Sequence, residues 1–462
     1  MKKISFFLLL VLSLLIPAGF VHAQTPTSSG PVYIVEEGDS LWSIAYRFHV
    51  SQDDLANANG ITNANQITIG QQLLIPGLEG LQGILDTVQV PYGETLHSLS
   101  LRYYLTEDVL GQLNHLTSPN EIFKGYYLVI FQSSVASTPG ARDDLEAGES
   151  ILEMAVINNT NSWNILSNNQ LENSAGVVAG EILRMPGGDD SGPGALPPGI
   201  TAVSISGLEQ GQTSETIIEG VEGASIQGLL MGHPLNFFQD PQSLLVALQG
   251  IHAMADPGLY TLSISATLAD NTQFTFAQNV LIAAGDFLFD IPLTVDPVTL
   301  EPENTVPEDS QWRELSSPAS PERLWDGVFS LPVEPVFAEC YASRFGSRRS
   351  YNGSEYKYYH TGLDYCGQVG DPIYAAAAGV VVFAGPMTVR GNATMIDHGW
   401  GVYSAYMHQS EILVNVGDQV EEGQLIGWVG NTGRVEGAHL HFEILVGNIP
   451  VDPLMWLSQE YP

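Results

Sequence analysis

A repeat of 55 residues in the N-terminal part of the chain restricts its fold more than any other feature. Three glycines, Gly38, Gly93 and Gly148, lie 55 residues apart, and each precedes an acidic residue, a serine or threonine and an aliphatic residue. Two further sets keep the same interval; they are Asn59, Asn114 and Asn169, and Gly70, Gly125 and Gly180. Three independent sets at one period indicate three copies of one small structural unit.

Each copy has the pattern of a strand, two short helices and a closing strand. In the first copy the strand "VYIV" is followed by Ser40, which can cap a helix. The apolar residues that recur behind it at helical spacing are Leu41, Ile44, Ala45 and Phe48. A second helix around Asp53 to Asn59 and the strand "QLLIP" complete the unit. The expected order is therefore βααβ, a small α+β module.

This unit resembles the lysin motif (LysM), a module that binds N-acetylglucosamine-containing glycans such as peptidoglycan or chitin. The resemblance covers residues 32–76 and 88–131, and is weaker for a degenerate, LysM-like copy at 143–186, where "NNTNSWNILSNN" replaces the usual aliphatic residues. In the family the glycan lies against the loop after the first strand and the loop before the last strand. The implied glycan-binding residues of the first copy are Gly38, Asp39, Ser40, Leu41, Ile69 and Gly70. The alternative is that these residues only shape the turns.

The first 23 residues have the pattern of a secretory signal peptide. Lys2 and Lys3 precede an apolar stretch from Phe6 to Phe20, and "VHA" supplies small residues for cleavage before Gln24. The alternative, a membrane helix, is disfavoured because the stretch is short for spanning and is interrupted by a proline. We therefore expect an exported, cell-wall-associated protein without a permanent membrane anchor.

Composition excludes several classes of partner and site. The 462 residues include 51 acidic and 15 basic side chains, a net charge of −36. Nucleic acid and anionic membranes attract clusters of lysine and arginine, which this chain lacks. Its two cysteines, Cys340 and Cys366, are too few for a cysteine-based zinc site, so a metal must be held by histidine and carboxylate. In an exported protein the two can form a disulfide, although the sequence does not show whether their geometry fits.

The middle of the chain consists of a linker, a strand-rich domain and a second linker. The segment "GGDDSGPGALPPG" at 187–199 has the composition of a linker. Residues 200–297 contain alternating strand patterns, and "DPGLYTLSIS" resembles a late strand of an immunoglobulin-like β-sandwich. We expect this domain to act as a spacer or docking module. An acidic, proline-rich linker is expected at 298–330, before a final domain at 331–462.

Five of the 11 histidines lie between residues 360 and 441. In "GAHLHFEI", His439 and His441 would share one face of a strand about 6–7 Å apart, close enough to serve one metal centre. An isolated H-x-H is more often a pair of partly exposed strand histidines. His398, beside a turn in "IDHG", is expected to be structural.

A second segment, "YYHTGLDY", supplies His360 and Asp364. An extended chain would hold them about 13 Å apart, too far to share an ion. A bend is therefore needed, in a loop or a bent strand end, and Gly362 permits it. With His441 they make two imidazoles and one carboxylate, the ligand set of a catalytic zinc site that leaves a fourth position for water.

The ordered set resembles the lysostaphin/LytM-type zinc metallopeptidases, which cut peptide bonds in bacterial peptidoglycan. It consists of H-x3-D, the Y-x-H of "AYMHQSEI" and the terminal "GNTGRVEGAHLHFEI", and the resemblance covers about residues 335–458. It implies an all-β domain with one Zn²⁺ ion held by His360, Asp364 and His441. It also implies two catalytic histidines, His408 and His439, of which one accepts a proton from water and the other binds the developing oxyanion. The sequence does not decide which does which.

The sequence thus predicts a multidomain protein of LysM repeats, a β-sandwich and an all-β peptidase. The expected function is a zinc-dependent endopeptidase that cleaves peptidoglycan stems or crosslinks while glycan-binding modules anchor it. One alternative is a non-catalytic regulator of other cell-wall hydrolases, a class that typically lacks the zinc ligands. The other is a purely glycan-binding or adhesive protein, which leaves the C-terminal histidines unexplained. The scissile bond is not given by the sequence.

Overall fold

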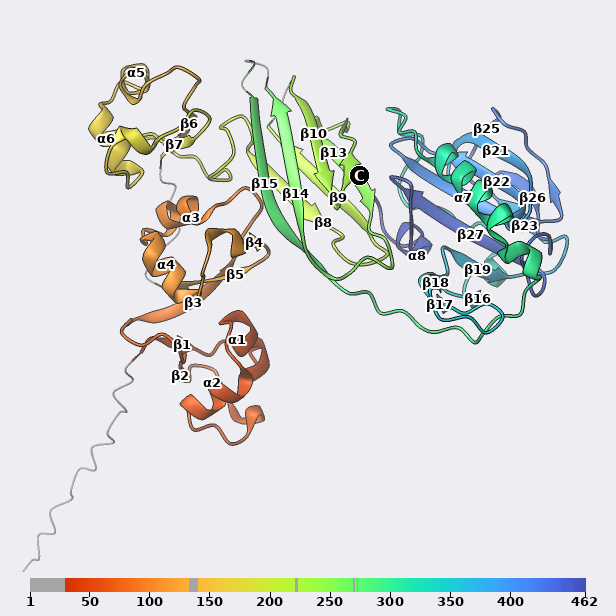
Figure 1. Ribbon diagram of the computed structural model, residues 1–462, viewed down its shortest axis with the longest axis horizontal. Helices are drawn as coiled ribbons and strands as arrows, with labels where there is room; N and C mark the ends of the chain where they lie inside the picture. The colour runs from red at the N-terminus through yellow and green to blue at the C-terminus, as the bar shows by residue number, and fades with distance from the viewer. Residues whose placement is uncertain (1–29, 133–139, 221–222, 269–270, 272) are drawn as a thin grey trace, which may run out of the picture. The chain divides into compact units, whose positions relative to one another are not determined.

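The computed structural model describes residues 30–132, 140–220, 223–268, 271 and 273–462 (Figure 1). The chain divides into a first unit that ends at Leu85 and a second unit that runs from Asp86 to Pro462. The predicted signal peptide at 1–23 lies outside the described residues. Within the described part of the chain, no helix combines the length and the apolar character needed to cross a membrane.

The first repeat has the predicted order of strands and helices. Ser40 accepts a hydrogen bond from the amide of Ser43, whose hydroxyl accepts one from the amide of Ser40, so a capping box starts the first helix. Leu41, Ile44 and Phe48 are buried against the second helix and the closing strand. The elements are β1 (Val32–Ile34), α1 (Leu41–Arg47), α2 (Gln52–Ala58) and β2 (Gln72–Leu74), and β1 pairs with β2 in antiparallel fashion.

The second and third repeats have the same order. In the second repeat the elements are β3 (Ile84–Gln89), α3 (Leu96–Tyr103), α4 (Glu107–Leu113), β4 (Phe123–Lys124) and β5 (Tyr127–Phe131). In the third they are β6 (Arg142–Asp144), α5 (Ile151–Ile157), α6 (Ser162–Asn168) and β7 (Ile182–Arg184). The polar third copy therefore folds like the others, around buried residues that include Ile151, Met154, Ile165 and Leu183.

The residues that recur every 55 positions have backbone roles. Asn59 donates from Nδ2 to the carbonyl oxygens of Leu55 and Leu74, both at 2.8 Å, and accepts from the amide of Leu74 at 2.7 Å. Asn114 and Asn169 make the same three bonds in their own repeats. The six recurring glycines have φ between 82° and 93°. That region favours glycine, so the period follows from helix ends and turns.

Two sheets with a shared hydrophobic core form the next domain. One sheet has the order β12-β13-β9-β8, and the other has the order β11-β10-β14-β15, with β4 of the second repeat at its edge. Their bounds are β8 (Ala202–Ser206), β9 (Thr213–Glu219), β10 (Ser225–Leu230), β11 (His233–Leu235), β12 (Phe238–Gln239), β13 (Leu245–Gly250), β14 (Gly258–Thr267) and β15 (Gln273–Ile282). Core residues come from both sheets, including Ile205, Ile218, Leu230, Leu262, Ile264 and Val280.

The segment 187–199, expected to be a linker, is packed against the second and third repeats and the sandwich. Leu196 and Ile200 are fully buried in the sandwich core. The guanidinium of Arg142 donates to the carbonyl oxygens of Pro193 and Leu196 and pairs with Asp190. A buried guanidinium needs acceptors, and this irregular segment supplies them from its backbone. Composition alone did not reveal this partner, which lies about 50 residues earlier in the chain.

The C-terminal domain is mostly β. Its main sheet has the order β16-β19-β27-β23-β22-β21-β25, and β28 pairs with β27. The strands of this sheet are β16 (Tyr341–Ser343), β19 (Leu363–Cys366), β21 (Gly379–Met387), β22 (Gly391–Asp397), β23 (Val402–Gln409), β25 (Gln419–Val420), β27 (His439–Val446) and β28 (Ile449–Val451). Smaller sheets are formed by β17 (Arg348–Arg349) with β18 (Tyr358–Tyr359), and by β20 (Pro372–Tyr374), β26 (Leu425–Trp428) and β24 (Glu411–Ile412).

The expected linker at 298–330 contains a helix, α7 (Pro302–Ser316), that packs on the main sheet (Figure 1). Trp312 is buried among side chains that include Met395, Tyr403 and Leu445. The Glu308 carboxylate accepts from the amides of Val389 and Arg390 at 2.8 and 2.9 Å. The interpretation of this segment as a linker is therefore corrected, because one aromatic side chain and one buried carboxylate fix it to the sheet.

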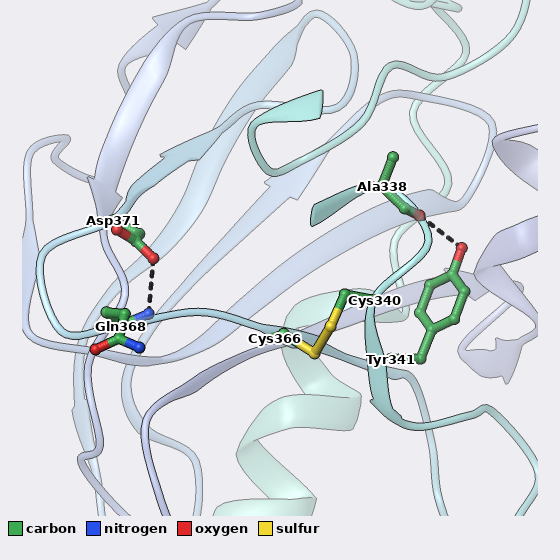
Figure 2. Close-up of a disulfide and its surroundings, with 6 residues drawn as sticks. All are labelled: Ala338, Cys340, Tyr341, Cys366, Gln368 and Asp371. Atoms are coloured by element: carbon green, nitrogen blue, oxygen red, sulfur yellow. Dashed lines mark hydrogen bonds between the residues drawn. A yellow bond between two sulfur atoms is a disulfide. The ribbon is translucent and has the colours of Figure 1, made fainter. Parts of the chain in front are cut away.

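Cys340 and Cys366 form the disulfide that the sequence left open (Figure 2). Their Cα atoms are 5.5 Å apart, and the amide of Cys366 donates to the carbonyl oxygen of Cys340 at 3.0 Å. The bond joins the residue before β16 to the end of β19. It thereby fixes the edge of the sheet that carries Asp364.

Candidate metal centre and groove

Strand β27 directs three polar side chains to the same face. His441 Nδ1 lies 2.8 Å from Asp364 Oδ1, and His439 Nε2 lies 3.5 Å from the same oxygen. On its other side, His441 Nε2 lies 3.0 Å from Glu443 Oε1. The expected shared face of His439 and His441 is thus found. Glu443 belongs to the same face, and extending the alternation by two residues would have identified it.

Strand β19 places Asp364 opposite His441 in the ladder. His360 lies before this strand, and the bend at Gly362 brings its Nε2 to 3.0 Å from Asp364 Oδ1 and 2.9 Å from His441 Nδ1. A Cβ atom at Gly362 would lie 2.3 Å from the carbonyl oxygen of Phe442. Glycine is therefore needed for close contact with β27, and the three residues proposed as ligands come together.

The outer hydrogen bonds of the two imidazoles assign their protons. His360 Nδ1 lies 2.9 Å from the carbonyl oxygen of Arg344, which can only accept, so the proton is on Nδ1 and Nε2 has a free lone pair. His441 Nε2 donates to Glu443, so Nδ1, which faces Asp364, is the nitrogen that can release its proton and bind a metal. These two nitrogens and a carboxylate oxygen of Asp364 lie within 4.8 Å of one another, an arrangement that can hold one metal ion.

Buried charge at this cluster favours a cation. Burial alone would raise the pKa of Asp364, but the adjacent His360 and His441 hold it well below its usual range, so the carboxylate stays ionised. Burial would lower the pKa of His441, but its hydrogen bonds to Asp364 and Glu443 outweigh burial and raise it to about 9. Burial lowers the pKa of His360 to about 4, which keeps this imidazole neutral.

Two further carboxylate contacts hold the ligands in place. Arg349 donates to Asp364 Oδ2 at 2.8 Å, and its Nε lies 3.3 Å from Asp290. Glu443 accepts from Trp312 Nε1 at 3.3 Å and from the hydroxyl of Thr361. Helix α7 therefore supports His441 through Trp312 and Glu443. Sequence reasoning found neither Arg349 nor α7.

Arg348 points away from the metal centre. Its guanidinium donates to the carbonyl oxygen of Ala253 at 2.9 Å and lies 4.8 Å from the centre of the Phe287 ring. Arg348 therefore joins the peptidase domain to the sandwich, while the next residue, Arg349, faces the metal centre.

His408 and His439 lie beside the three candidate ligands. Their ring centres are 4.9 Å apart, and that of His408 is 5.9 Å from that of His441. His408 Nδ1 donates to the carbonyl oxygen of Thr432 at 2.8 Å, which leaves Nε2 as an acceptor. Burial, and then the adjacent His439 and His441, lower the pKa of His408 well below its usual value. With φ of 63°, His408 also has the strained backbone common at functional sites.

His398 lies in the domain core. Its Nδ1 donates to the carbonyl oxygen of Ala378 at 2.7 Å, and its Nε2 lies 2.7 Å from the hydroxyl of Ser404. Both nitrogens are thus used within the fold, in agreement with a structural role.

Two cavities flank the metal centre, and His408, His441 and Arg349 line both. One, of about 360 Å³, is also lined by Lys357, Tyr358, Tyr359 and two residues of the sandwich, His252 and Met254. The other, of about 320 Å³, is lined by His439, Glu436 and the segment from Asp290 to Val295. The groove is therefore built by the peptidase domain together with residues outside its expected limits.

The six positions proposed to bind glycan differ in their surroundings. Ile69 is 70% exposed, and Gly38, Ser40 and Gly70 are also exposed. Leu41 is buried in the core of the repeat. Asp39 accepts from the hydroxyl of Tyr33 at 2.6 Å and pairs with Arg47. The side chains of Leu41, Asp39 and Ser40 thus serve the fold of the repeat, whereas Gly38, Ile69 and Gly70 are open to a ligand.

Comparison with protein families assigns two kinds of domain. Residues 358–453 match the model of peptidase family M23, and residues 33–76 and 88–131 match the LysM domain. The chain contains an M23 peptidase domain and two LysM domains. The stated resemblances of 32–76 and 88–131 to LysM, and of the C-terminal domain to this peptidase family, are confirmed. The LysM-like character of the third copy at 143–186 stays a prediction. His360, Asp364, His408, His439 and His441 all lie inside the M23 segment.

Individual relatives match about a quarter of the chain. The peptidoglycan DD-endopeptidase ShyA of Vibrio cholerae is 40% identical over 113 residues, 24% of this chain and 26% of that protein. The DD-carboxypeptidase/endopeptidase Mpg of Neisseria meningitidis is 39% identical over 122 residues, 26% of this chain and 28% of that protein. The chain thus spans about a quarter of the length of these curated relatives. A structure of the antimicrobial peptidase lysostaphin from Staphylococcus simulans is 36% identical, covers 21% of this chain and 44% of that chain, and has a TM-score of 0.21.

Proposed function

We propose that this protein is an exported, zinc-dependent endopeptidase that cleaves peptide stems or crosslinks of peptidoglycan, and that LysM modules anchor it to the glycan. The observation that carries the proposal is the convergence of His360, Asp364 and His441 inside an M23 domain, with one possible ligand atom of each within 4.8 Å of the others. Two imidazoles and one carboxylate are a typical catalytic zinc set that leaves one position for water.

The side chains around this point can support hydrolysis. Zinc, when bound, would polarise the scissile carbonyl and make the attacking water more acidic. His408 is neutral near pH 7 and has a free Nε2, so it can accept the proton of that water. His439, at the edge of the groove, is placed to hydrogen-bond the oxyanion or to return a proton to the leaving amine. Arg349 and Glu443 keep the ligands in the required orientation.

The groove suits an anionic peptide. Although the chain has a net charge of −36, Lys357 and Arg434 line the cavity of about 360 Å³, where they can bind the carboxylates of peptide stems. Arg349 and Arg390, in the same cavity, pair with Asp364 and Glu308. The tyrosines Tyr358 and Tyr359 add flat apolar surface. ShyA is described as a DD-endopeptidase and Mpg as a DD-carboxypeptidase/endopeptidase, which makes a D,D-crosslink the first bond to test.

The test uses the purified chain, loaded with zinc, on insoluble peptidoglycan sacculi. We expect clearing of the suspension, release of new amino groups, and muropeptides whose masses identify the broken bond. A chelator should stop the reaction and added zinc should restore it. A zinc-loaded protein that releases no fragments would favour the non-catalytic regulator, and a protein that binds no zinc would exclude the endopeptidase.

We also propose that the two-sheet domain is immunoglobulin-like. Taken in chain order as strands A to G with one extra strand, its sheets have the orders D-E-B-A and C′-C-F-G. This domain contributes His252 and Met254 to the groove, so it does more than space the other modules.

A further inference from the structure

The two loops of a repeat that are proposed to meet glycan form one edge, which we call the glycan edge. This edge is exposed in the first (32–76) and third (143–186) repeats but covered in the second (88–131). In the first repeat, four of the positions proposed to bind glycan are exposed; they are Gly38, Ser40, Ile69 and Gly70. The equivalent positions of the third repeat are also exposed; they are Gly148, Ser150, Ala179 and Gly180. In the second repeat Gly93 and Glu94 are buried, and Lys124 and Gly125 are half-buried. Since the three repeats share one fold, the difference comes from what covers the second.

The first contact is an aromatic residue inserted into the sandwich. Tyr92 is 1% exposed, belongs to the sandwich core, and donates from its hydroxyl to the carbonyl oxygen of Leu262 at 3.1 Å. The next amide, that of Gly93, donates to the side-chain oxygen of Gln278 on β15 at 2.9 Å. The residues equivalent to Tyr92 in the other repeats are Glu37 and Ala147, and both are exposed.

The second contact lies at the other loop of the same edge. Strand β4 extends the sandwich sheet by pairing with β15 in parallel, with Phe123 opposite Asn279. Lys124 Nζ donates to the carbonyl oxygen of Ile205 at 2.8 Å, and burial lowers its pKa. Lys124 is equivalent to Ile69 of the first repeat, which is 70% exposed.

The third contact comes from the segment 187–200. The amide of Ala195 donates to the carbonyl oxygen of Gly93 at 2.9 Å, and a Cβ atom added to Gly93 would lie 2.5 Å from Pro193. Arg102 of the second repeat pairs with Glu94 at 2.6 Å and donates to the carbonyl oxygen of Gly192 at 2.9 Å. This segment therefore closes the loop that is open in the other repeats.

We propose that the second LysM repeat is an intramolecular joint whose partner is the chain's own sandwich, and that glycan recognition rests on the first repeat and not on the second. This inference depends on the proposed glycan anchoring. In the second repeat, the edge that would meet a sugar is occupied by the sandwich. Tyr92 and Lys124 bond to its carbonyl oxygens, and the amide of Gly93 bonds to its Gln278, so a glycan would have to displace these contacts. The joint also fixes a LysM fold to the domain that contributes His252 and Met254 to the groove.

The first experiment measures binding of the full chain to insoluble sacculi. Ile69→Glu places a charge on the exposed edge of the first repeat, and we expect binding to fall about tenfold. Lys124→Ala alters the equivalent position of the second repeat, and we expect binding within twofold of the unmodified chain. Equal losses from both substitutions, or a loss from Lys124→Ala alone, would overturn the assignment.

The second experiment tests the joint from its other side by amide hydrogen exchange. Gln278→Ala removes the acceptor of the Gly93 amide, and we expect faster exchange at residues 90–96 of the second repeat. Thr275→Ala, an exposed substitution on the same strand, should leave that exchange unchanged. Unaltered exchange in Gln278→Ala would refute the joint. If the unmodified chain binds no sacculi, the proposed glycan anchoring fails, while this exchange result still decides whether the joint exists.

Discussion

The LysM repeats and the M23 domain both contain sets of polar and glycine residues that stand out in the sequence, but those sets serve different ends. In the repeats, Asn59 and its equivalents satisfy backbone groups at a helix end and on the last strand. In the M23 domain, His360, Asp364 and His441 place ring nitrogens and a carboxylate oxygen 2.8–3.0 Å from one another. A conspicuous residue is therefore structural when its polar atoms are saturated by backbone, and chemical when they are left facing each other.

The largest expected effect comes from removing one candidate metal ligand, which should abolish the chemistry and leave the structural residues of the repeats intact. His441→Ala should lower kcat/KM on peptidoglycan by at least about 10³-fold, since the zinc set loses one of three ligands. The zinc content should fall together with kcat/KM, while the fold of the LysM repeats, which the recurring asparagines stabilise, should not change. Metal analysis and release of amino groups measure both effects. Retained zinc with full activity would remove His441 from the centre.

A substitution of one recurring asparagine in the repeats should lower stability and leave zinc binding and catalysis unchanged. Asn114→Ala removes a side chain that makes three buried hydrogen bonds, and leaves two carbonyls and one amide without that partner. We expect a loss of about 3 kcal/mol in the free energy of unfolding of the second repeat. Zinc content and cleavage of a small soluble peptide should not change. Denaturant unfolding followed by hydrogen exchange in 107–113 measures the effect, and loss of zinc would contradict it.

Glu443 lies between the two classes, because it is buried and saturated yet contacts a proposed ligand. Glu443→Gln keeps the shape but removes the charge that holds the proton on His441 Nε2. We expect zinc affinity to fall about 10- to 100-fold. Trp312→Phe, which removes one donor to the same carboxylate, should have a smaller effect. If zinc affinity is the same in Glu443→Gln, the residue is only structural.

Local patterns predicted the parts of the molecule in which neighbouring residues decide the structure. The βααβ repeats follow from caps and helical spacing, and the shared face of His439 and His441 follows from strand alternation. Gly362 was correctly given as the bend, although its reason is contact with the backbone of Phe442.

The parts that the sequence did not predict depend on partners far along the chain. The segment 187–199 reads as a linker until Arg142 is placed beneath it. Helix α7 has few apolar residues, and the surroundings of Trp312 on the main sheet decide its position. The choice between Arg348 and Arg349 depends on which face of β17 meets Asp364. Neither the composition of a segment nor the period of its apolar residues predicts such long-range contacts.

His398 provides a test of a histidine that is not part of the metal centre. Burial lowers its pKa to about 4 from an ordinary value near 6.5, so the unfolded chain binds a proton between these values and the folded chain does not. Stability should therefore fall as pH drops below 6.5, by about 2 kcal/mol between pH 7.5 and 5. His398→Gln should lose this part of the pH dependence. Urea unfolding at both pH values measures it, and an equal slope in both proteins would refute it.

The smallest expected effect concerns the contribution of the sandwich to the groove. Met254 is 40% exposed and lines the cavity beside the metal centre. Met254→Ala should raise KM for crosslinked peptide about two- to fivefold and leave kcat unchanged, since it removes binding surface that ground state and transition state share. The exposed Leu259→Ala, on β14 of the same domain, is the matched control and should change neither constant. A fall in kcat with unchanged KM would mean that the sandwich acts on the chemical step itself. The sandwich residues at the groove would then belong with the chemical residues of the M23 domain and not with the structural ones.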